Sequence, residues 1–475
     1  MMRNVICSLA AISTFVAPSL AKADSPVQKP NILVFIADDL GWEEIGAYGH
    51  PVIKTPNIDW LAQNGIRFDN FYLAASSSSP SRCSILTGMY PSCTGAANLH
   101  ENMPEHINLF PDRLHDAGYY TMLVGKTHGT NHPKVKSRFD YGKFIDWSKP
   151  WTMVDLWKEA LTQRPKDQPF FMFAASIDPH RPYKQGHFEH PYHPDQVVVP
   201  PYLQDSPEMR EELADYYDEI GRFDDHIGQV LNLLREEGTL ENTLIIVMTD
   251  NGRPFPQCKT RVNVQGLKSP FIVYCPSLIK RGSVTKSLAS AVDIAPTLLE
   301  VAGVKRSPGL QGISLLPILG NPSAEIRKYA FAEHNWHVFR AYERSVIMEN
   351  YVYIKNWLPH LPNPSVGETM RMPAYKKMLD SYLKGDELPQ VQQDCFIAPR
   401  PAEELYKIPD DIHCVNNLIG EKEKKAIVEE MRLVLDVWQQ SIGDSYPGEK
   451  KLKGDTSDRR TGEKLKKENT ADVAD

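Results

Sequence analysis

Residues 31–41 read NILVFIADDLG, an unbroken apolar run that stops at two aspartates. A run of this length, rich in Val, Ile and Phe, is typical of a strand buried on both faces of a parallel sheet. The same pattern recurs in YYTMLVGKTH (119–128), PFFMFAASIDPH (169–180), TLIIVMTDNG (243–252) and PFIVYCP (270–276). The sequence therefore predicts a series of buried strands that belong to one sheet.

Amphipathic patterns occupy the intervals between these runs. The clearest predicted helix extends from about residue 208 to residue 237, and its apolar face carries Leu213, Tyr217, Ile220, Phe223, Ile227, Val230, Leu231 and Leu234. Strands that alternate with helices indicate an α/β fold. We therefore predict a large mixed, mostly parallel sheet sandwiched by helices, and we assign residues 24–330 to this domain.

The pattern changes after residue 330. The stretch YAFAEHNWHVFRAYERSVIMENYVYIKNW (329–357) alternates as antiparallel strands do, and EKEKKAIVEEMRLVLDVWQQSI (421–442) reads as an amphipathic helix. These features predict a smaller C-terminal α+β domain over residues 331–447. Residues 448–475 contain almost no apolar side chains, so we expect a disordered polar tail there.

The first residues, 1–23, have the composition of a secretory signal peptide. Arg3 precedes a short apolar core, and the segment ends in Ala21-Lys22-Ala23. We expect cleavage after Ala23 and an exported protein, either periplasmic or secreted. The apolar core is too short to span a bilayer, and no later segment reads as a membrane span. A net charge of −7 argues against a general nucleic-acid binder.

Six cysteines follow the predicted cleavage point, and export would allow them to oxidise. Cys395 and Cys414 lie in a Pro- and Asp-rich region and are the best candidates for a disulfide. Cys83 and Cys275 are flanked by apolar residues, which favours buried thiols. No pair has the spacing of a zinc site.

Charged, imidazole and amide side chains follow four of the predicted strands. The carboxyl ends of strands in an open α/β sheet form the ligand crevice. Each residue alone reads more simply as a helix cap, a turn residue or a solvated charge. Three carboxylates and an amide at one edge would repel each other without a cation, and oxygen ligands favour Ca²⁺ or Mg²⁺ over zinc. The residues concerned are Asp38, Asp39, Lys126, His128, Asp178, His180, Asp250 and Asn251.

With these motifs in view, the sequence resembles a type I sulfatase of the alkaline-phosphatase superfamily, from about residue 29 to residue 443. The most specific feature is Ser78-x-Pro80-x-Arg82 followed by an apolar segment that ends in Thr87-Gly88. Further matching motifs are NILVFIADDLG, GKTH, DPH, TDNG and ELYKIPDDIHCVNNL (404–418). The segment PFPQCKT (254–260) is closer to the heparan N-sulfatase (sulfamidase) branch than to other sulfatases.

The resemblance implies that Ser78 is the precursor of Cα-formylglycine, made by a radical maturase. Only this serine of the run 76–79 has Pro at +2 and Arg at +4. One hydroxyl of the hydrated aldehyde would attack sulfur, and deprotonation of the other would expel sulfate. The resemblance also implies one Ca²⁺ ion, held by Asp38, Asp39, Asp250, Asn251 and residue 78.

The remaining roles follow from the same resemblance. Arg82 would hold the nucleophile and the metal ligands, and Lys126 would bind sulfate. His128 would be the base of the second step, whereas His180 would protonate the leaving atom with help from Lys259. Arg261 and Lys268 are rival candidates for the position of Lys259, because this region lacks the Glu-Gly-Gly triplet of many sulfatases.

A basic and aromatic cluster in the second domain suits a sulfated sugar, with arginines for anions and rings for sugar faces. Ordinary packing of alternating strands explains the same residues equally well, and Trp336 and Trp357 read equally as core residues. The expected substrate-binding residues are His100, His337, Arg340 and Arg344, with His334 beside them.

We thus predict an exported sulfatase that acts on a sulfated polysaccharide or oligosaccharide. The sequence leaves open whether it cleaves O-sulfate or N-sulfate, and it predicts no oligomeric state. Two alternatives remain. A phosphomonoester or phosphonate hydrolase of the same superfamily would use unmodified Ser78. A catalytically inactive sulfated-glycan-binding protein would result if the serine is never oxidised.

Overall fold

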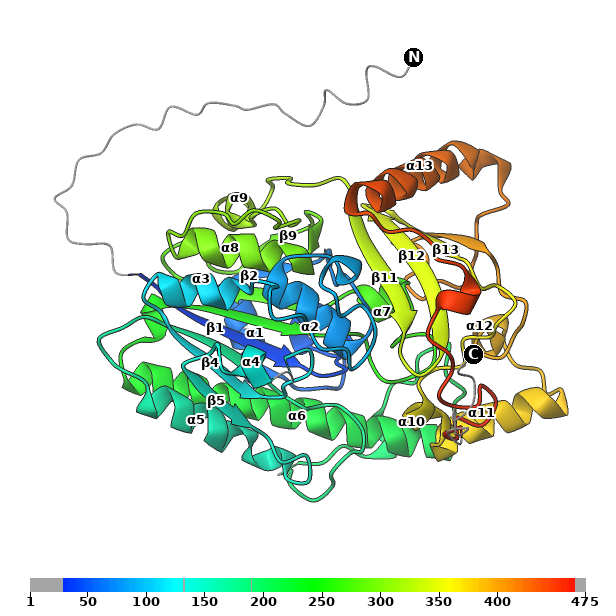
Figure 1. Cartoon of the computed structure of the whole chain (residues 1–475). Coiled ribbons are helices and arrows are strands. Elements are labelled where there is room, and N and C mark those ends of the chain that lie inside the picture. The colour runs from blue at the N-terminus through cyan, green and yellow to red at the C-terminus, as the bar shows by residue number, and fades with distance from the viewer. Residues whose placement is uncertain (1–28, 131–132, 189, 466–475) are drawn as a thin grey trace, which may run out of the picture.

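The computed structural model describes residues 29–130, 133–188 and 190–465, which form two parts that lie side by side (Figure 1). The larger part is an α/β layer structure, and the smaller part carries a second sheet. The predicted signal peptide, 1–23, lies outside the described residues. Among the helices described, none combines the length and the apolar character that crossing a membrane requires.

The main sheet has eight strands in the order β5-β4-β6-β1-β7-β8-β2-β9. Its strands are parallel except β8, which runs antiparallel to both β7 and β2. The prediction of a mixed, mostly parallel sheet is therefore confirmed. The strands are β1 (Asn31–Ala37), β2 (Ile66–Phe68), β4 (Tyr120–Gly125), β5 (Tyr141–Phe144), β6 (Phe170–Ala175), β7 (Thr243–Thr249), β8 (Phe271–Tyr274) and β9 (Ser283–Thr285).

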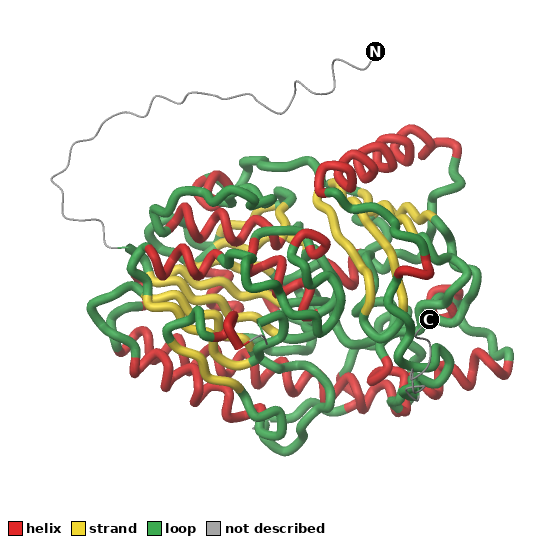
Figure 2. Tube along the Cα trace, viewed as in Figure 1, coloured by secondary structure: helices red, strands yellow, loops and turns green. Residues whose placement is uncertain are grey.

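Helices cover both faces of this sheet, as the helices around the strands of Figure 2 show. Successive residues of a strand point to opposite faces, so Leu33 and Phe35 pack against one helical layer while Ile32 and Val34 pack against the other. The first layer contains α1 (Pro56–Asn64), α5 (Met153–Gln163) and α6 (Pro207–Glu236), and the second contains α2 (Ser78–Thr87), α3 (Phe110–Asp116) and α8 (Ile294–Val301). This double cover explains why the strands read as continuous apolar runs.

The long helix α6 confirms the prediction for residues 208–237. It begins where Ser206 accepts a hydrogen bond from the backbone N–H of Met209 and where Pro207 occupies the first turn. Both features are typical helix starts, since serine satisfies a free N–H and proline needs none.

The second sheet is antiparallel, in the order β11-β12-β13-β14. One face packs under α13 (Lys425–Ile442) through Val346 and Tyr353, and the other faces the first part through Ile347 and Val352. Helix α11 (Pro373–Lys384) contacts α6. The strands are β11 (Ala330–Trp336), β12 (Arg340–Met348), β13 (Tyr351–Asn356) and β14 (Glu403–Lys407). Besides several 3-10 helices, the remaining short elements are β3 (Phe71–Tyr72), α4 (Pro133–Lys136), α7 (Val264–Leu267), β10 (Ala289–Ser290), α9 (Leu316–Gly320), α10 (Gly367–Met370) and α12 (Gln390–Gln393).

Residues 448–465 differ from the disordered tail that the sequence predicts, because they pack on the second sheet. Trp336 Nε1 donates to the carbonyl of Gly454 at 2.8 Å, and the N–H of Arg340 donates to Asp455 Oδ1 at 2.6 Å. Arg459 donates to Asp455 and to the carbonyl of Arg340. Polar bonds rather than apolar burial hold this segment, so its composition gave no sign of order. Residues 466–475 lie outside the described part.

The predicted disulfide is wrong, since Cys395 and Cys414 are both free thiols, as are the other four cysteines among the described residues. Cys395 packs in a small apolar cluster with Tyr375, whereas Cys414 lies against a different cluster that contains Tyr406. Separate packing environments keep the two sulfur atoms from pairing. Cys83 and Cys275 are buried thiols, as predicted.

Candidate functional site

Four neighbouring parallel strands, β4, β6, β1 and β7, deliver their carboxyl ends to one edge of the main sheet. Ala37 pairs with Thr249 in the last rung between β1 and β7. The backbone N–H of Asp250 continues this ladder to the carbonyl of Ala37, and the N–H of Lys126 bonds to Ala175 in the same way. The residues that follow these strands therefore start from fixed positions close to one another.

The carboxylates of Asp38, Asp39 and Asp250 form a fully buried cluster at this edge. Asp39 has a φ of 72°, a left-handed conformation that non-glycine residues rarely adopt. Its N–H donates to Asp250 Oδ1 at 3.2 Å, and Asn251 Nδ2 donates to Asp39 Oδ1 at 2.6 Å. The structure thus gathers the four predicted metal-binding residues Asp38, Asp39, Asp250 and Asn251 at one edge of the sheet.

Ser78 lies at the first position of α2, after Ser77 in extended conformation. Its hydroxyl lies 3.2 Å from Asp38 Oδ1 and 3.0 Å from Asn251 Oδ1, so its single hydrogen is shared between two acceptors of the cluster. Ser76 donates instead to the carbonyl of Cys258, and Ser79 accepts from the N–H of His100. Ser78 is therefore the serine of this run that contacts the carboxylate cluster.

A cationic side chain pairs with each carboxylate. Lys126 Nζ lies 2.5 Å from Asp38 Oδ2, and Lys259 Nζ lies 2.8 Å from Asp39 Oδ2. Arg82 Nε donates to Asp250 Oδ2 at 2.7 Å. Three positive and three negative side chains balance each other, so a bound divalent cation would leave the cluster positive and able to attract an anion.

Burial and charge act in opposite directions on these groups. Burial alone would raise the pKa of Asp38, but Lys126 and the neighbouring His180 and Arg82 lower it, and the net pKa lies below the ordinary value. Burial lowers the pKa of Lys126, and Asp38 only partly offsets this effect. The pKa of Lys259 rises above its usual value, because Asp39 and Glu368 outweigh its burial. Asp38 is thereby held in the charged form that a cation requires.

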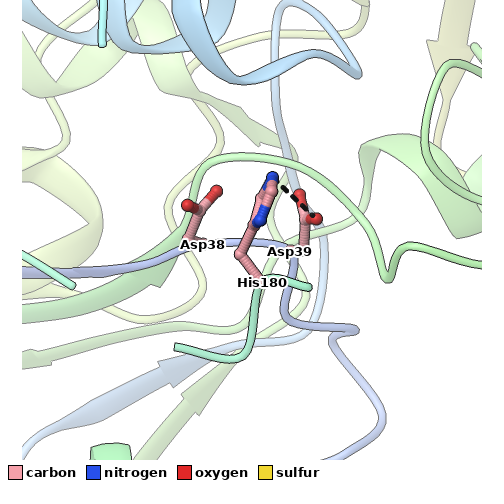
Figure 3. A group of neighbouring side chains, drawn as sticks. All are labelled: Asp38, Asp39 and His180. Carbon is pink, nitrogen blue, oxygen red and sulfur yellow. Dashed lines mark ion pairs between the residues drawn. The ribbon is translucent and has the colours of Figure 1, made fainter. Parts of the chain in front are cut away.

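Asp38, Asp39 and His180 can hold a metal ion, since one ligand atom from each lies within 4.8 Å of the others (Figure 3). The donors around them are mostly oxygen, from Asp250, Asn251 and Ser78, and this set suits a hard ion such as Ca²⁺. Imidazole nitrogen is an unusual ligand for such an ion. We therefore count His180 apart from the oxygen donors.

Beside the cluster lies a cavity of about 330 Å³. Its wall brings together most of the predicted catalytic residues and two of the predicted substrate-binding residues. The lining consists of Ser78, Leu99, His100, Lys126, Thr127, His128, Trp147, His180, Lys259, His337 and Glu368. The cavity is open to a ligand whose anionic end can reach Ser78 and both lysines.

The two histidines of the predicted chemistry differ in their surroundings. His180 Nδ1 lies 2.5 Å from the carbonyl of Arg181, so Nδ1 carries a proton and Nε2 faces the cavity, 3.8 Å from Asp39. His128 Nε2 contacts His100 Nδ1 at 2.6 Å. Burial, and then the charge of Lys126, hold the pKa of His128 well below its usual value. His128 is therefore neutral near neutral pH, as a base must be.

The structure distinguishes between Lys259, Arg261 and Lys268, the three candidates for the basic residue that assists His180. Lys259 lines the cavity, and its backbone is held in place where the next residue, Thr260, donates to the carbonyl of Ser76. Arg261 pairs instead with Asp394 at 2.7 Å, and Lys268 lies over the ring of Trp42. Of these rivals, only Lys259 contacts the cluster.

Arg344 is not placed to bind substrate, in contrast to the prediction. Its guanidinium is 1% exposed and forms a buried pair with Asp444 at 2.7 Å. Arg340 reaches Glu449 at 3.1 Å and does not line the cavity at Ser78. Both arginines join β12 to acidic residues that follow α13, so strand position alone was a poor guide to their role.

Asp178 follows β6 at the same edge, but its carboxylate is taken by another partner. Arg222 of α6 binds both of its oxygens, at 2.5 and 2.9 Å. The predicted strand-end pattern therefore includes one aspartate that joins the sheet to helix α6.

Four residues of the cavity lining were not predicted, namely Leu99, Thr127, Trp147 and Glu368. Trp147 lies at the rim, 44% exposed, with its ring edge-on to His180 and near Lys126 Nζ. Glu368 comes from α10 in the second part of the molecule. Trp147 lies in a polar loop and Glu368 in an unpatterned segment, so neither has a sequence signal of its own.

Comparison with known proteins agrees with this geometry. A family model described as Sulfatase matches residues 30–304, and one described as N-sulphoglucosamine sulphohydrolase, C-terminal, matches residues 259–358. N-sulphoglucosamine sulphohydrolase of Homo sapiens is 30% identical over 460 residues, which cover 88% of this chain and 91% of that protein. An ulvan-active sulfatase of Formosa agariphila is 28% identical over 474 residues, with 88% and 76% covered.

Solved structures share the fold. A protein solved in complex with its substrate, D-glucosamine-2-N,6-O-disulfate, has a TM-score of 0.66 and 21% identity, and the match covers 88% of this chain and 99% of that one. The family match over more than half of the chain, the 30% identical relative and the buried cluster around Ser78 agree. The chain belongs to the type I sulfatase family, is a sulfuric ester hydrolase, and resembles the sulfamidases within that family.

Proposed function

We propose that this protein is an exported sulfatase that removes sulfo groups from sulfated saccharides, with formylglycine made from Ser78 as its nucleophile. The observation that carries the proposal is the position of Ser78, whose hydroxyl contacts Asp38 and Asn251 and also lines the cavity. A nucleophile here can be held by the cluster and still reach a ligand.

The oxygen donors of Asp38, Asp39, Asp250 and Asn251 would hold Ca²⁺ together with residue 78. The ion would leave the cluster with a net positive charge and polarise sulfate oxygens. Lys126, Lys259, His128 and His180 would act on the substrate and on the nucleophile.

Lys126 and Lys259 bind the sulfo group, because both ammonium groups line the cavity and are fully buried. Arg82 belongs to α2, and its guanidinium donates to Asp250 just after β7. This bond holds the helix against the edge of the sheet. His128, neutral at working pH, accepts a proton in the second step. His180 donates a proton through Nε2 to the leaving atom.

The cavity has features that suit a sugar. Trp147 offers an exposed ring face of the kind that packs against sugar C–H groups, and His100 and His337 add polar groups. The names of two relatives, N-sulphoglucosamine sulphohydrolase and an ulvan-active sulfatase, refer to sulfated saccharides. These relatives support the same substrate class. Residues 1–23 support export, and a radical maturase would act on Ser78.

The test is to produce the protein with and without a serine-oxidising radical maturase. Matured protein should release sulfate from an aryl sulfate and from sulfated saccharides, and a peptide containing residue 78 should be two hydrogen atoms lighter. Phosphate release from a phosphomonoester, with plain serine at position 78, would favour the alternative hydrolase instead.

A further inference from the structure

Glu368 is the one acidic residue among the described residues that line the cavity. It belongs to α10, in the second part of the molecule, and 32% of its side chain is exposed to the cavity. Its Oε1 lies 3.4 Å from Lys259 Nζ and 3.6 Å from His180 Nε2. The acid thus stands beside the cation that binds the sulfo group and the group that protonates the leaving atom.

The ammonium group of Lys259, 3.4 Å away, favours the charged form of this carboxylate. Burial would raise the pKa of Glu368, but Lys259, His180 and His337 lower it, and the net pKa lies well below the ordinary value. A negative charge at this place repels an anionic substrate and weakens the grip of Lys259 on the sulfo group. Such a residue favours binding only if the substrate presents a hydrogen-bond donor to it.

The leaving atom must lie within hydrogen-bond reach of His180 Nε2, and Glu368 Oε1 is 3.6 Å from the same nitrogen. In a sulfate ester this atom is an oxygen with lone pairs and no hydrogen. In a sulfamate it is a nitrogen that carries one N–H. A carboxylate next to the leaving atom therefore repels the ester and accepts a hydrogen bond from the sulfamate.

We propose that Glu368 is a specificity-determining residue that selects substrates whose sulfo group is carried on nitrogen. The proposal rests on the sulfatase function proposed above and adds the residue that distinguishes between O- and N-linked sulfo groups. The substrate class is an amino sugar with a free N-sulfo group, positioned so that its N–H points to Glu368.

The reaction balances with water alone. R–NH–SO₃⁻ and H₂O give R–NH₃⁺ and SO₄²⁻, as the S–N bond breaks, an S–O bond forms and the nitrogen gains two protons. The product nitrogen is then cationic and lies beside an ionised carboxylate. Glu368 should therefore bind the amine product as well as the substrate.

The first experiment compares wild type with Glu368→Gln, both matured at residue 78, on three substrates. These are glucosamine N-sulfate, glucosamine 6-O-sulfate and an aryl sulfate. The kcat/KM for the N-sulfate should fall by about ten- to a hundredfold, the size expected for loss of a charge-assisted hydrogen bond. The kcat/KM for the other two should stay within about threefold or rise, because the repulsion is removed.

Glu387→Gln is the matched control, since Glu387 is an exposed glutamate further along the same part of the chain. It should leave all three substrates unchanged. An equal loss on all three with Glu368→Gln would overturn the proposal, because a residue that only orders Lys259 and His180 affects every sulfate alike. Wild type active on O-sulfates but not on the N-sulfate would also overturn it.

The second experiment needs no maturation and therefore separates this proposal from the proposed function. Unmodified protein should bind glucosamine more tightly than glucose in calorimetry, and Glu368→Gln should remove the difference. Equal binding of the two sugars by wild type would overturn the proposal. Absence of turnover on all three sulfates in protein shown by mass to be matured would instead refute the sulfatase function.

Discussion

The hydroxyl of Ser78 lies 3.0 Å from the amide oxygen of Asn251, although 173 positions separate the two residues. The contact joins the start of α2 to the residues that follow β7, both in the larger part of the molecule. The hydroxyl of Ser78, the proposed nucleophile precursor, is thus held against the carboxylate cluster at the edge of the sheet.

Ser78→Ala should abolish sulfate release, by at least about a thousandfold, because no other group of the serine run contacts the cluster. The fold should persist, since the substitution removes one hydroxyl at the start of a helix. Sulfate release from an aryl sulfate and the melting temperature measure the two effects.

Ser77→Ala is the control for this change, because the Ser77 hydroxyl is buried without a hydrogen-bond partner. It should leave activity within a few-fold of wild type. Full turnover by protein whose residue 78 is plain serine by mass would contradict the formylglycine mechanism.

Removal of the metal should inactivate the enzyme. Asp250→Ala should lose bound Ca²⁺ and activity together, since Asp250 also holds Asp39 and Arg82. Elemental analysis of wild type should find one Ca²⁺ per chain. Stoichiometric zinc, or activity indifferent to chelation, would count against the assignment.

The acid limb of the pH profile should lie well below the ordinary pKa of histidine. A general base works in its neutral form, and burial together with Lys126 holds the pKa of His128 low. Lowering the pH through about 6.5 should therefore leave His128 neutral and active. The kcat/KM profile on an aryl sulfate checks this, and an inflection near 6.5 that disappears in His128→Ala would show the opposite.

Asp224 of α6 stabilises the start of α1, because its carboxylate accepts from the N–H groups of Ile58 and Asn57 at 2.8 and 3.2 Å. Asp224→Ala should destabilise the fold by about 1 kcal/mol or more, the usual cost of losing such a cap. Denaturant unfolding measures the change. A loss no larger than that of a surface substitution would rule out the capping role.

The same residue should give a pH dependence of known sign. Burial raises the pKa of Asp224 to about 7, from an ordinary value of 3.8. The folded state then holds a proton that the unfolded state has lost between these values, so the contribution to stability is present below 3.8 and disappears as pH rises through about 7. Asp224→Asn should flatten this part of the stability profile in urea titrations, and a parallel profile would contradict it.

Removal of residues 449–475 should weaken saccharide binding without stopping the chemistry. Gly454 and Asp455 bond to Trp336 and Arg340, on either side of the turn that carries His337 into the cavity. KM for a sulfated oligosaccharide should rise, whereas kcat/KM for an aryl sulfate should stay nearly unchanged. Equal losses on both substrates would indicate a general effect on the fold.

The sequence by itself determined the fold class and the central cluster. Apolar runs that end in Asp38, Lys126 or Asp250 predict both the strands and the edge at which their polar residues meet. The inference succeeds because parallel strands place their carboxyl ends on one side of a sheet, so order along the chain becomes proximity in space. The Ser78–Arg82 motif is likewise local, since its spacing on one helix turn fixes both side chains.

Only the tertiary structure decided which residues from the second part complete the cavity. Glu368 reaches Lys259 from an unpatterned segment, whereas Arg344, in a promising strand, is taken up by Asp444. The free state of Cys395 and the packing of residues 448–465 belong to the same class. Each depends on a partner that no local pattern specifies, because a charged or polar side chain takes its role from whichever group the fold brings within hydrogen-bond distance.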